Sequence, residues 1–141
     1  MCAWRDRGSW VMVVDDDLGV RSALVDLFTV EGYRAVAVSS GESAFVELAR
    51  DPEPALIILD LWIPGMGSAA FIRRLRASPH AQVPVVVFSA ASSVAQVDLD
   101  VDAVLSKSSE STALVRAVDR LAISGRPRHG VNRCVPRHER R

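Results

Sequence analysis

The chain has 141 residues, of which 49% are hydrophobic and 24% charged, and its formal net charge is zero. This length suits a single domain, and the composition is that of a globular protein, which excludes a disordered, collagenous or membrane-spanning chain. No apolar run approaches the roughly 18 residues of a membrane helix and no signal peptide is recognisable at the start, so we expect a cytoplasmic protein.

The neutral total hides an uneven distribution of charge. Residues 1–124 carry 11 basic and 16 acidic side chains, whereas residues 125–141 carry six arginines against Glu139 alone. The last segment also has two prolines and no apolar periodicity, so we expect a basic, disordered tail there and an N-terminal extension over residues 1–9. The two cysteines lie in these terminal segments and have neither a disulfide pattern nor metal-ligand spacing.

The first part of the chain alternates strand, helix and strand. Residues 10–14 form an apolar run of strand length, and Leu24 and Phe28 then recur one helical turn apart. Gly32 stands where this helix should end, and residues 34–38 form the second apolar run.

The middle of the chain repeats this alternation. A helix is predicted over about residues 40–50, with Ser40 as its N-cap and with Leu48 and Ala49 among the residues that face inward. A third strand is predicted at residues 55–59, which read Ala-Leu-Ile-Ile-Leu.

The last part contains two further strands and two clear helices. A helix is predicted over about residues 68–77, a strand at 84–88, a strand at 103–105 and a final helix over about 111–123. The connection between the last two strands is short and contains Ser-Ser-Val-Ala-Gln-Val-Asp-Leu-Asp-Val-Asp, which is poor helix material. We therefore expect a fourth helix that is short or irregular.

The alternation of strands and helices predicts the fold class. Parallel strands joined by right-handed helical crossovers place helices on both faces of a sheet. Strands buried on both faces read as continuous apolar runs, as Val-Met-Val-Val, Leu-Ile-Ile-Leu and Val-Val-Val-Phe do. The expected fold is a three-layer α/β sandwich with five parallel strands.

Polar residues follow four of the five predicted strands, at or just past the strand ends. In an open α/β sheet the functional crevice lies beyond the carboxyl ends of the strands, so these side chains should face one rim. They are Asp15, Asp16, Asp17, Asp60, Ser89 and Lys107.

These residue types suit chemistry on a phosphoryl group. Carboxylates that converge on a small volume repel one another unless a cation lies among them, and Mg²⁺ prefers such oxygen ligands. Lys107, the only lysine, offers a compact cation for an anionic ligand, Ser89 offers a hydroxyl, and an aspartate can itself be a nucleophile. Each residue also has a plainer interpretation, and for Asp17 we favour a helix N-cap.

At these positions the sequence resembles the receiver domain of two-component response regulators, of which the single-domain chemotaxis response regulator is the best-known example. The resemblance covers about residues 10–124. It rests on Val-Val-Asp-Asp-Asp at the first strand, Ile-Ile-Leu-Asp-Leu-Trp-Ile-Pro-Gly-Met at the third, Val-Val-Val-Phe-Ser-Ala at the fourth and Leu-Ser-Lys at the fifth. It implies a flavodoxin-like fold with strand order 2-1-3-4-5.

The resemblance also implies roles for the carboxylates. Asp60 would be the phospho-acceptor, taking a phosphoryl group from a sensor histidine kinase or a phosphotransfer protein. Asp15, Asp16 and Asp60, together with the backbone carbonyl of Trp62, would bind Mg²⁺. The protein would then be a signalling phospho-acceptor of a phosphorelay and not an enzyme in the ordinary sense.

Ser89 and Lys107 match the family's switch hydroxyl and phosphate-pairing lysine, but the residues around Lys107 depart from the family pattern. Ser108 replaces the usual proline, which the family holds in a cis peptide, and Val104 replaces the aromatic switch residue. These departures leave open a second hypothesis, a receiver-like interaction module that does not switch on phosphorylation. A metal-dependent aspartate phosphatase is a third, although Trp62 interrupts the Asp-x-Asp pattern of such enzymes.

The resemblance further implies an output through protein contacts. A downstream partner would bind the fourth helix, fifth strand and fifth helix, and homodimer formation is left open. The 17 residues after the last helix leave no room for a DNA-binding domain, so we expect a single-domain response regulator.

Overall fold

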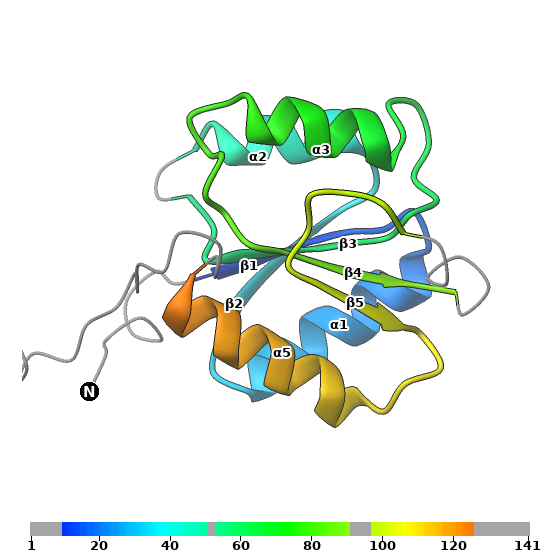
Figure 1. Ribbon diagram of the computed structural model, residues 1–141. Coiled ribbons are helices and arrows are strands. Elements are labelled where there is room, and N and C mark those ends of the chain that lie inside the picture. The colour runs from blue at the N-terminus through cyan, green and yellow to red at the C-terminus, as the bar shows by residue number, and fades with distance from the viewer. Residues whose placement is uncertain (1–9, 51–52, 91–96, 126–141) are drawn as a thin grey trace, which may run out of the picture.

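Five parallel strands form one sheet between two layers of helices (Figure 1). The computed structural model describes residues 10–50, 53–90 and 97–125. The strands are β1 (Trp10–Val14), β2 (Arg34–Val38), β3 (Leu56–Leu59), β4 (Val85–Ser89) and β5 (Ala103–Ser106). Their order, β2-β1-β3-β4-β5, confirms the predicted flavodoxin-like topology.

The two helical layers lie on opposite faces of the sheet. In Figure 1, α2 and α3 cover one face and α1 and α5 cover the other. The helices are α1 (Leu18–Val30), α2 (Gly41–Leu48), α3 (Ser68–Arg76) and α5 (Ser111–Ser124). None of the helices in the described ranges is long and apolar enough to span a membrane.

Burial follows the position of each strand in the sheet. Every residue of β1 and β3 is buried, whereas the edge strands β2 and β5 are only partly covered. Alternate residues of β1 enter opposite cores, because successive side chains of a strand point to opposite faces. Met12 packs in the core with Phe71 of α3, and Val13 packs in the core with Phe28 of α1.

The ends of the first two helices confirm local predictions from the sequence. Asp17 is the N-cap of α1, and its carboxylate accepts a hydrogen bond from the Val20 amide at 3.1 Å. Ser40 is the N-cap of α2, and its hydroxyl accepts from the Ser43 amide at 3.1 Å. Gly32 follows α1 with a φ of 96°, a conformation that favours glycine.

One inward-facing residue was predicted wrongly. Ala49 is the C-cap of α2 and is exposed, while Ala44 is buried instead. Residues 44 and 48 lie one turn apart on the covered face of α2, and Ala49 comes after the last full turn. The helical periodicity is correct, but the helix ends before Ala49.

The connection between β4 and β5 is irregular where the structure describes it. Residues 97–102 form no helix, in agreement with the expectation for the fourth helix, and residues 91–96 lie outside the described ranges. The predicted N-terminal extension, the basic tail after Gly125 and both cysteines also lie outside them.

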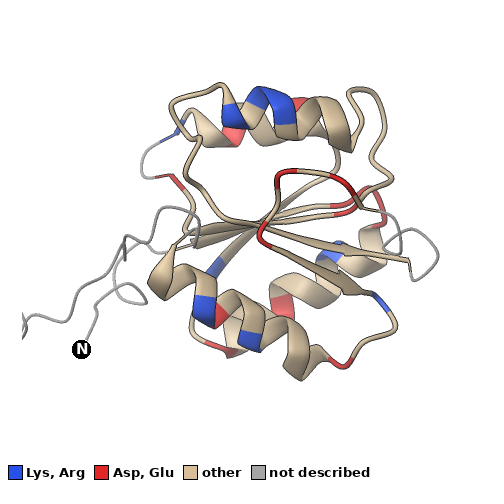
Figure 2. Ribbon diagram, viewed as in Figure 1, with Lys and Arg blue, Asp and Glu red and all other residues tan. Residues whose placement is uncertain are grey.

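Arg76, at the end of α3, holds this irregular connection in place. Its guanidinium donates to the carbonyl oxygens of Ala81 at 2.9 Å, Val83 at 2.7 Å and Asp100 at 3.0 and 3.1 Å. It also lies 3.5 Å from the carboxylate of Asp102, which in turn accepts the Val85 amide. In Figure 2, α3 carries basic residues and lies above a loop that carries acidic ones.

Candidate functional site

The strand ladder continues one residue past three of the strands and thereby positions the predicted site residues. The Asp15 amide donates to the carbonyl oxygen of Val38 at 3.1 Å, and the Asp60 amide donates to that of Val14 at 2.9 Å. The Lys107 amide donates to the carbonyl oxygen of Ser89 at 2.7 Å. All three side chains therefore start from a fixed backbone at the carboxyl edge of the sheet.

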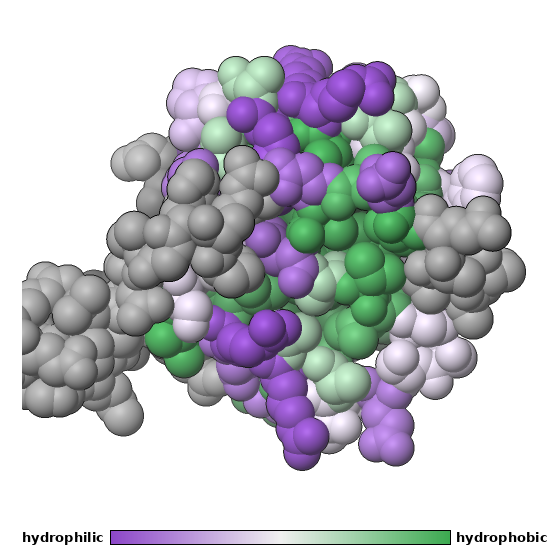
Figure 3. Space-filling model, viewed as in Figure 1, coloured by the Kyte–Doolittle hydropathy of each residue, from purple (hydrophilic) through white to green (hydrophobic). Residues whose placement is uncertain are grey.

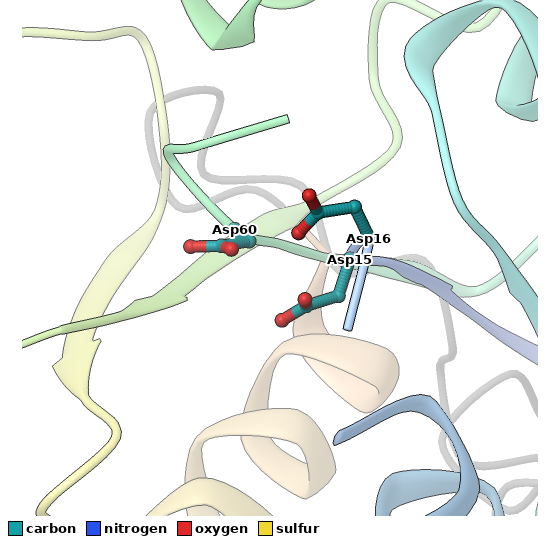
Figure 4. A group of neighbouring side chains, drawn as sticks. All are labelled: Asp15, Asp16 and Asp60. Carbon is teal, nitrogen blue, oxygen red and sulfur yellow. The ribbon is translucent and has the colours of Figure 1, made fainter. Parts of the chain in front are cut away.

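Three carboxylates meet at this edge, as Figure 4 shows. One oxygen each from Asp15, Asp16 and Asp60 lies within 4.8 Å of the other two. Asp15 and Asp60 are 2% and 6% exposed, whereas Asp16 is exposed to solvent. The carboxylate of Asp17 caps α1 by accepting the Val20 amide, and it is not part of the cluster.

Lys107 supplies the cation of the site. Its Nζ lies 2.8 Å from Asp15 Oδ2 and 3.4 Å from Asp60 Oδ2. Burial alone would lower the pKa of Lys107, but the hydrogen bond and charge of Asp15, with a smaller contribution from Asp60, raise the pKa above its ordinary 10.5. The lysine is therefore a firmly charged group between two carboxylates.

Ser89, at the end of β4, is completely buried and reaches the same carboxylate. Its hydroxyl donates to Asp60 Oδ1 at 2.5 Å and accepts from the Leu61 amide at 3.4 Å. The two oxygens of Asp60 thus have different neighbours, a hydroxyl at Oδ1 and the Lys107 ammonium at Oδ2. Ser89 at the end of β4 and Lys107 just after β5 therefore orient the Asp60 carboxylate together.

The donor set of the cluster suits a hard divalent cation. Three carboxylates face a single ammonium, so the site keeps an excess of negative charge. Carboxylate oxygens beside open solvent, which supplies the remaining waters, are the ligands that Mg²⁺ prefers. The residues present therefore fit Mg²⁺, and Asp15, Asp16 and Asp60 are the side chains that would hold it.

The remaining predicted positions border this cluster. The side chain of Trp62 is 70% exposed, and its backbone carbonyl stays a predicted metal ligand. Position 104 of β5, where the family has an aromatic switch residue, carries a valine that is 37% exposed. Ser108 is exposed, and its amide donates to the hydroxyl of Ser106 at 3.1 Å.

Two residues that contact the site were not predicted from the sequence. Arg21 Nη1 donates to the backbone carbonyl oxygen of Asp15 at 2.9 Å, across six residues of chain. Nothing in the local sequence indicates this contact. Ser106 holds the turn after Lys107, and here the Ser-x-Ser spacing of Ser106 and Ser108 was a usable signal, because serine hydroxyls often accept the amide two residues on.

Comparison with known proteins supports the resemblance noted in the sequence. The model of the response regulator receiver domain family matches residues 11–119. The two-component response regulator ORR7 of Oryza sativa is 35% identical over 81 residues, which are 57% of this chain and 39% of that protein. The sensory transduction protein RegX3 of Mycolicibacterium smegmatis is 32% identical over 115 residues, which are 77% of this chain and 49% of that one. The chain thus spans half or less of the length of these two relatives.

Solved structures show the same fold. A response regulator receiver protein from Pseudomonas putida is 27% identical, with a TM-score of 0.71 over 79% of this chain and 96% of that one. The response regulator TrrA of Thermotoga maritima, solved in complex with Mg(2+)-BeF, is 25% identical, with a TM-score of 0.71 over 80% of this chain and 98% of that one.

Proposed function

Because the chain belongs to the receiver domain family of two-component response regulators, we propose that it accepts a phosphoryl group on Asp60 from a sensor histidine kinase or a phosphotransfer protein. The observation that carries this proposal is the environment of Asp60. Its buried carboxylate lies between the Ser89 hydroxyl and the Lys107 ammonium, beside two further carboxylates. This carboxylate is therefore held by two neighbouring side chains and is only slightly exposed to solvent.

In this proposal Asp15, Asp16, Asp60 and the backbone carbonyl of Trp62 bind Mg²⁺. The bound ion would neutralise negative charge that develops on the transferred group. The excess of carboxylates over ammonium in the cluster supports this assignment.

The transfer itself is a displacement at phosphorus. A carboxylate oxygen of Asp60 forms the new P–O bond while the bond from phosphorus to the donor breaks, and the electron pair leaves with the donor group. The Lys107 ammonium pairs with the transferred oxygens, and the Ser89 hydroxyl donates to one of them instead of to Asp60 Oδ1. Each of these groups already lies within hydrogen-bond reach of Asp60 or close to it.

A groove beside Lys107 offers the phosphodonor protein a place to bind. It has a volume of about 350 Å³ and lies between α1 and α5, where Leu24, Phe88 and Leu114 line it together with Lys107. Apolar walls next to the site let a partner bury surface while its phosphohistidine approaches Asp60. Lys107 lines this groove and also lies 3.4 Å from Asp60 Oδ2, so a partner bound in the groove would lie next to the proposed acceptor.

For the output we propose binding of a downstream protein at β5, α5 and the connection before β5, within a receiver domain of residues 10–124. Figure 3 shows apolar side chains between α3 and α5 on this face. Val104 on β5 is 37% exposed, and Leu99 and Val101, in the connection before β5, are partly buried against the core. As an alternative within this proposal, two copies of the chain would form a homodimer through the same face.

The test is labelling by a small phosphodonor. Acetyl phosphate with Mg²⁺ should add one phosphoryl group, detected by intact-protein mass spectrometry, and EDTA should prevent it. Asp60→Asn should abolish labelling, and Asp98→Asn, an exposed aspartate in the β4–β5 connection, should label as the wild type does. Labelling that persists in Asp60→Asn, or a wild type that stays unlabelled with Mg²⁺, would contradict the proposal.

A second candidate is a receiver that binds a partner without switching, and the valine at position 104 is the observation that favours it. The two candidates differ in how far a beryllofluoride adduct acts. If amide chemical shifts change only near Asp60, the second candidate holds. Changes that extend along β5 into α5 would support phosphorylation-dependent signalling.

A further inference from the structure

Lys107 is followed by a tight turn that closes onto Ser106. The Ser109 amide donates to the Ser106 carbonyl oxygen at 2.9 Å, and the Ser108 amide donates to the Ser106 hydroxyl at 3.1 Å. The hydroxyls of Ser106 and Ser108 also lie 2.7 Å apart. One serine thus accepts the two amides that come directly after the lysine.

The position of the Lys107 ammonium depends on how the backbone around it is held. A lysine side chain is a flexible four-carbon stem, so its ammonium stays near two carboxylates only if its starting point is fixed. On the N-terminal side, the bond from the Lys107 amide to the Ser89 carbonyl oxygen provides this restraint. On the C-terminal side the pairing of β5 with β4 ends at Ser106, and the turn takes the place of the strand there.

The peptide plane between Lys107 and Ser108 is oriented by the Ser108 amide. That amide needs an acceptor, and the Ser106 hydroxyl supplies one from within the turn. Solvent could also accept it, because Ser108 is exposed, but water would not fix the direction of the peptide plane. The Ser106 hydroxyl therefore fixes the direction of the peptide plane, which solvent would leave free to vary.

We propose that Ser106 is a positioning residue whose hydroxyl, by accepting the Ser108 amide, holds Lys107 so that its ammonium reaches Asp15 and Asp60. The hydroxyl of Ser106 bonds within the turn, so Ser106 acts on the two carboxylates through Lys107. The consequence for phosphoryl transfer rests on the proposed function, whereas the placement of the ammonium does not.

The kinetic arm of the test compares variants of the turn in the full chain. With acetyl phosphate and Mg²⁺, Ser106→Ala should slow phosphorylation roughly 2- to 10-fold, the effect of one net hydrogen bond. Ser106→Thr keeps a hydroxyl, and Ser108→Ala keeps the amide, so each should stay within about twofold of the wild type. Equal losses in all three variants, or no loss in Ser106→Ala, would overturn the proposal.

The spectroscopic arm needs no phosphorylation. Because Lys107 is the only lysine, protein labelled with ¹³Cε-lysine gives one side-chain signal. In the wild type the two ε-protons should have separate shifts, since the ammonium is held between carboxylates, and in Ser106→Ala they should converge. The core amide spectrum and the melting temperature of each variant show whether it remains folded. An unchanged Lys107 signal in folded Ser106→Ala would refute the positioning role.

A double variant isolates the hydrogen bond itself. Ser108→Pro removes the amide that Ser106 accepts, so adding Ser106→Ala to it should change the Lys107 signal and the rate no further. An additional loss would show that Ser106 acts by another route. A wild type that is not labelled would contradict the proposed function. The Lys107 signal would still show whether Ser106 positions the ammonium.

Discussion

Lys107 and Asp15 form the closest ion pair of the site, with Nζ and Oδ2 2.8 Å apart. The hydrogen bond and the charge of Asp15 are the largest effects that raise the pKa of Lys107, and together with Asp60 they outweigh the opposing effect of burial. Because the pKa is raised in the folded state, the stabilisation from this lysine is present below its ordinary pKa of 10.5. It is lost as the pH rises through the folded-state value.

Asp15→Asn should therefore lower the pKa of Lys107. The substitution removes a neighbouring negative charge and replaces a carboxylate acceptor with an amide, so the ammonium loses its main partner. The pKa can be followed as the ¹³Cε shift of Lys107 against pH, without Mg²⁺. Asp98→Asn is the matched control and should leave the pKa where it is, and an unaltered pKa in Asp15→Asn would contradict the geometry.

Individual residues differ in how far the sequence could predict them. Asp17 and Ser40 were predicted as caps because a cap interacts with amides two or three residues away. Arg21 could not be predicted, since its contact with the Asp15 carbonyl depends on how α1 leaves the sheet. A cap acts within one turn and can be predicted from the sequence, whereas the contact of Arg21 depends on the packing angle of a helix and cannot.

At the scale of elements, α3 and the start of β5 are joined by a buried ion pair. The side chains of Arg76 and Asp102 are 11% and 3% exposed, and Asp102 also accepts the amide of Val85 at the start of β4. Because the connection before β5 is irregular, this pair and the hydrogen bonds of Arg76 hold it against α3.

Arg76→Met should lower the free energy of unfolding by about 3 kcal/mol, because it removes the cation next to a buried carboxylate and the hydrogen bonds that Arg76 donates to three carbonyl oxygens. Urea unfolding followed by circular dichroism measures the loss. Arg73→Met, on the exposed side of the same helix, is the control and should change the stability by less than about 0.5 kcal/mol. A similar stability for both variants would show that the ion pair contributes nothing net.

The strands and the helix at residues 68–76 were predictable because continuous apolar runs and helical periodicity are local signals. The observed ends of these elements differ from the predicted ends by about one residue. The connection before β5 was predicted only as poor helix material, since its anchor, Arg76, lies 24 residues before Asp100 in the sequence.

For the molecule as a whole, the acidic cluster links metal binding to stability. Without a cation the sheet holds three carboxylates against one ammonium, and any ion that binds only the folded state stabilises it by mass action.

Mg²⁺ should therefore raise the melting temperature. At about 100 times its dissociation constant the gain is about 2.7 kcal/mol, which for a domain of this size is on the order of 10 °C. Differential scanning fluorimetry in MgCl₂, compared with EDTA and with KCl of equal ionic strength, measures the shift. Asp15→Asn should reduce the gain, and a shift that KCl reproduces would point to screening instead of binding.

The same ladder that forms the sheet also carries the amides of Asp15, Asp60 and Lys107. In deuterated water the amides of Asp15 and Asp60, which follow the buried strands β1 and β3, should exchange more slowly than the amide of Lys107, which follows the edge strand β5. The amide of Ser108, bonded to a hydroxyl in an exposed turn, should exchange early. We thus expect the two carboxylates to be held as persistently as the central strands, whereas the turn beside Lys107 should open without unfolding the rest of the sheet.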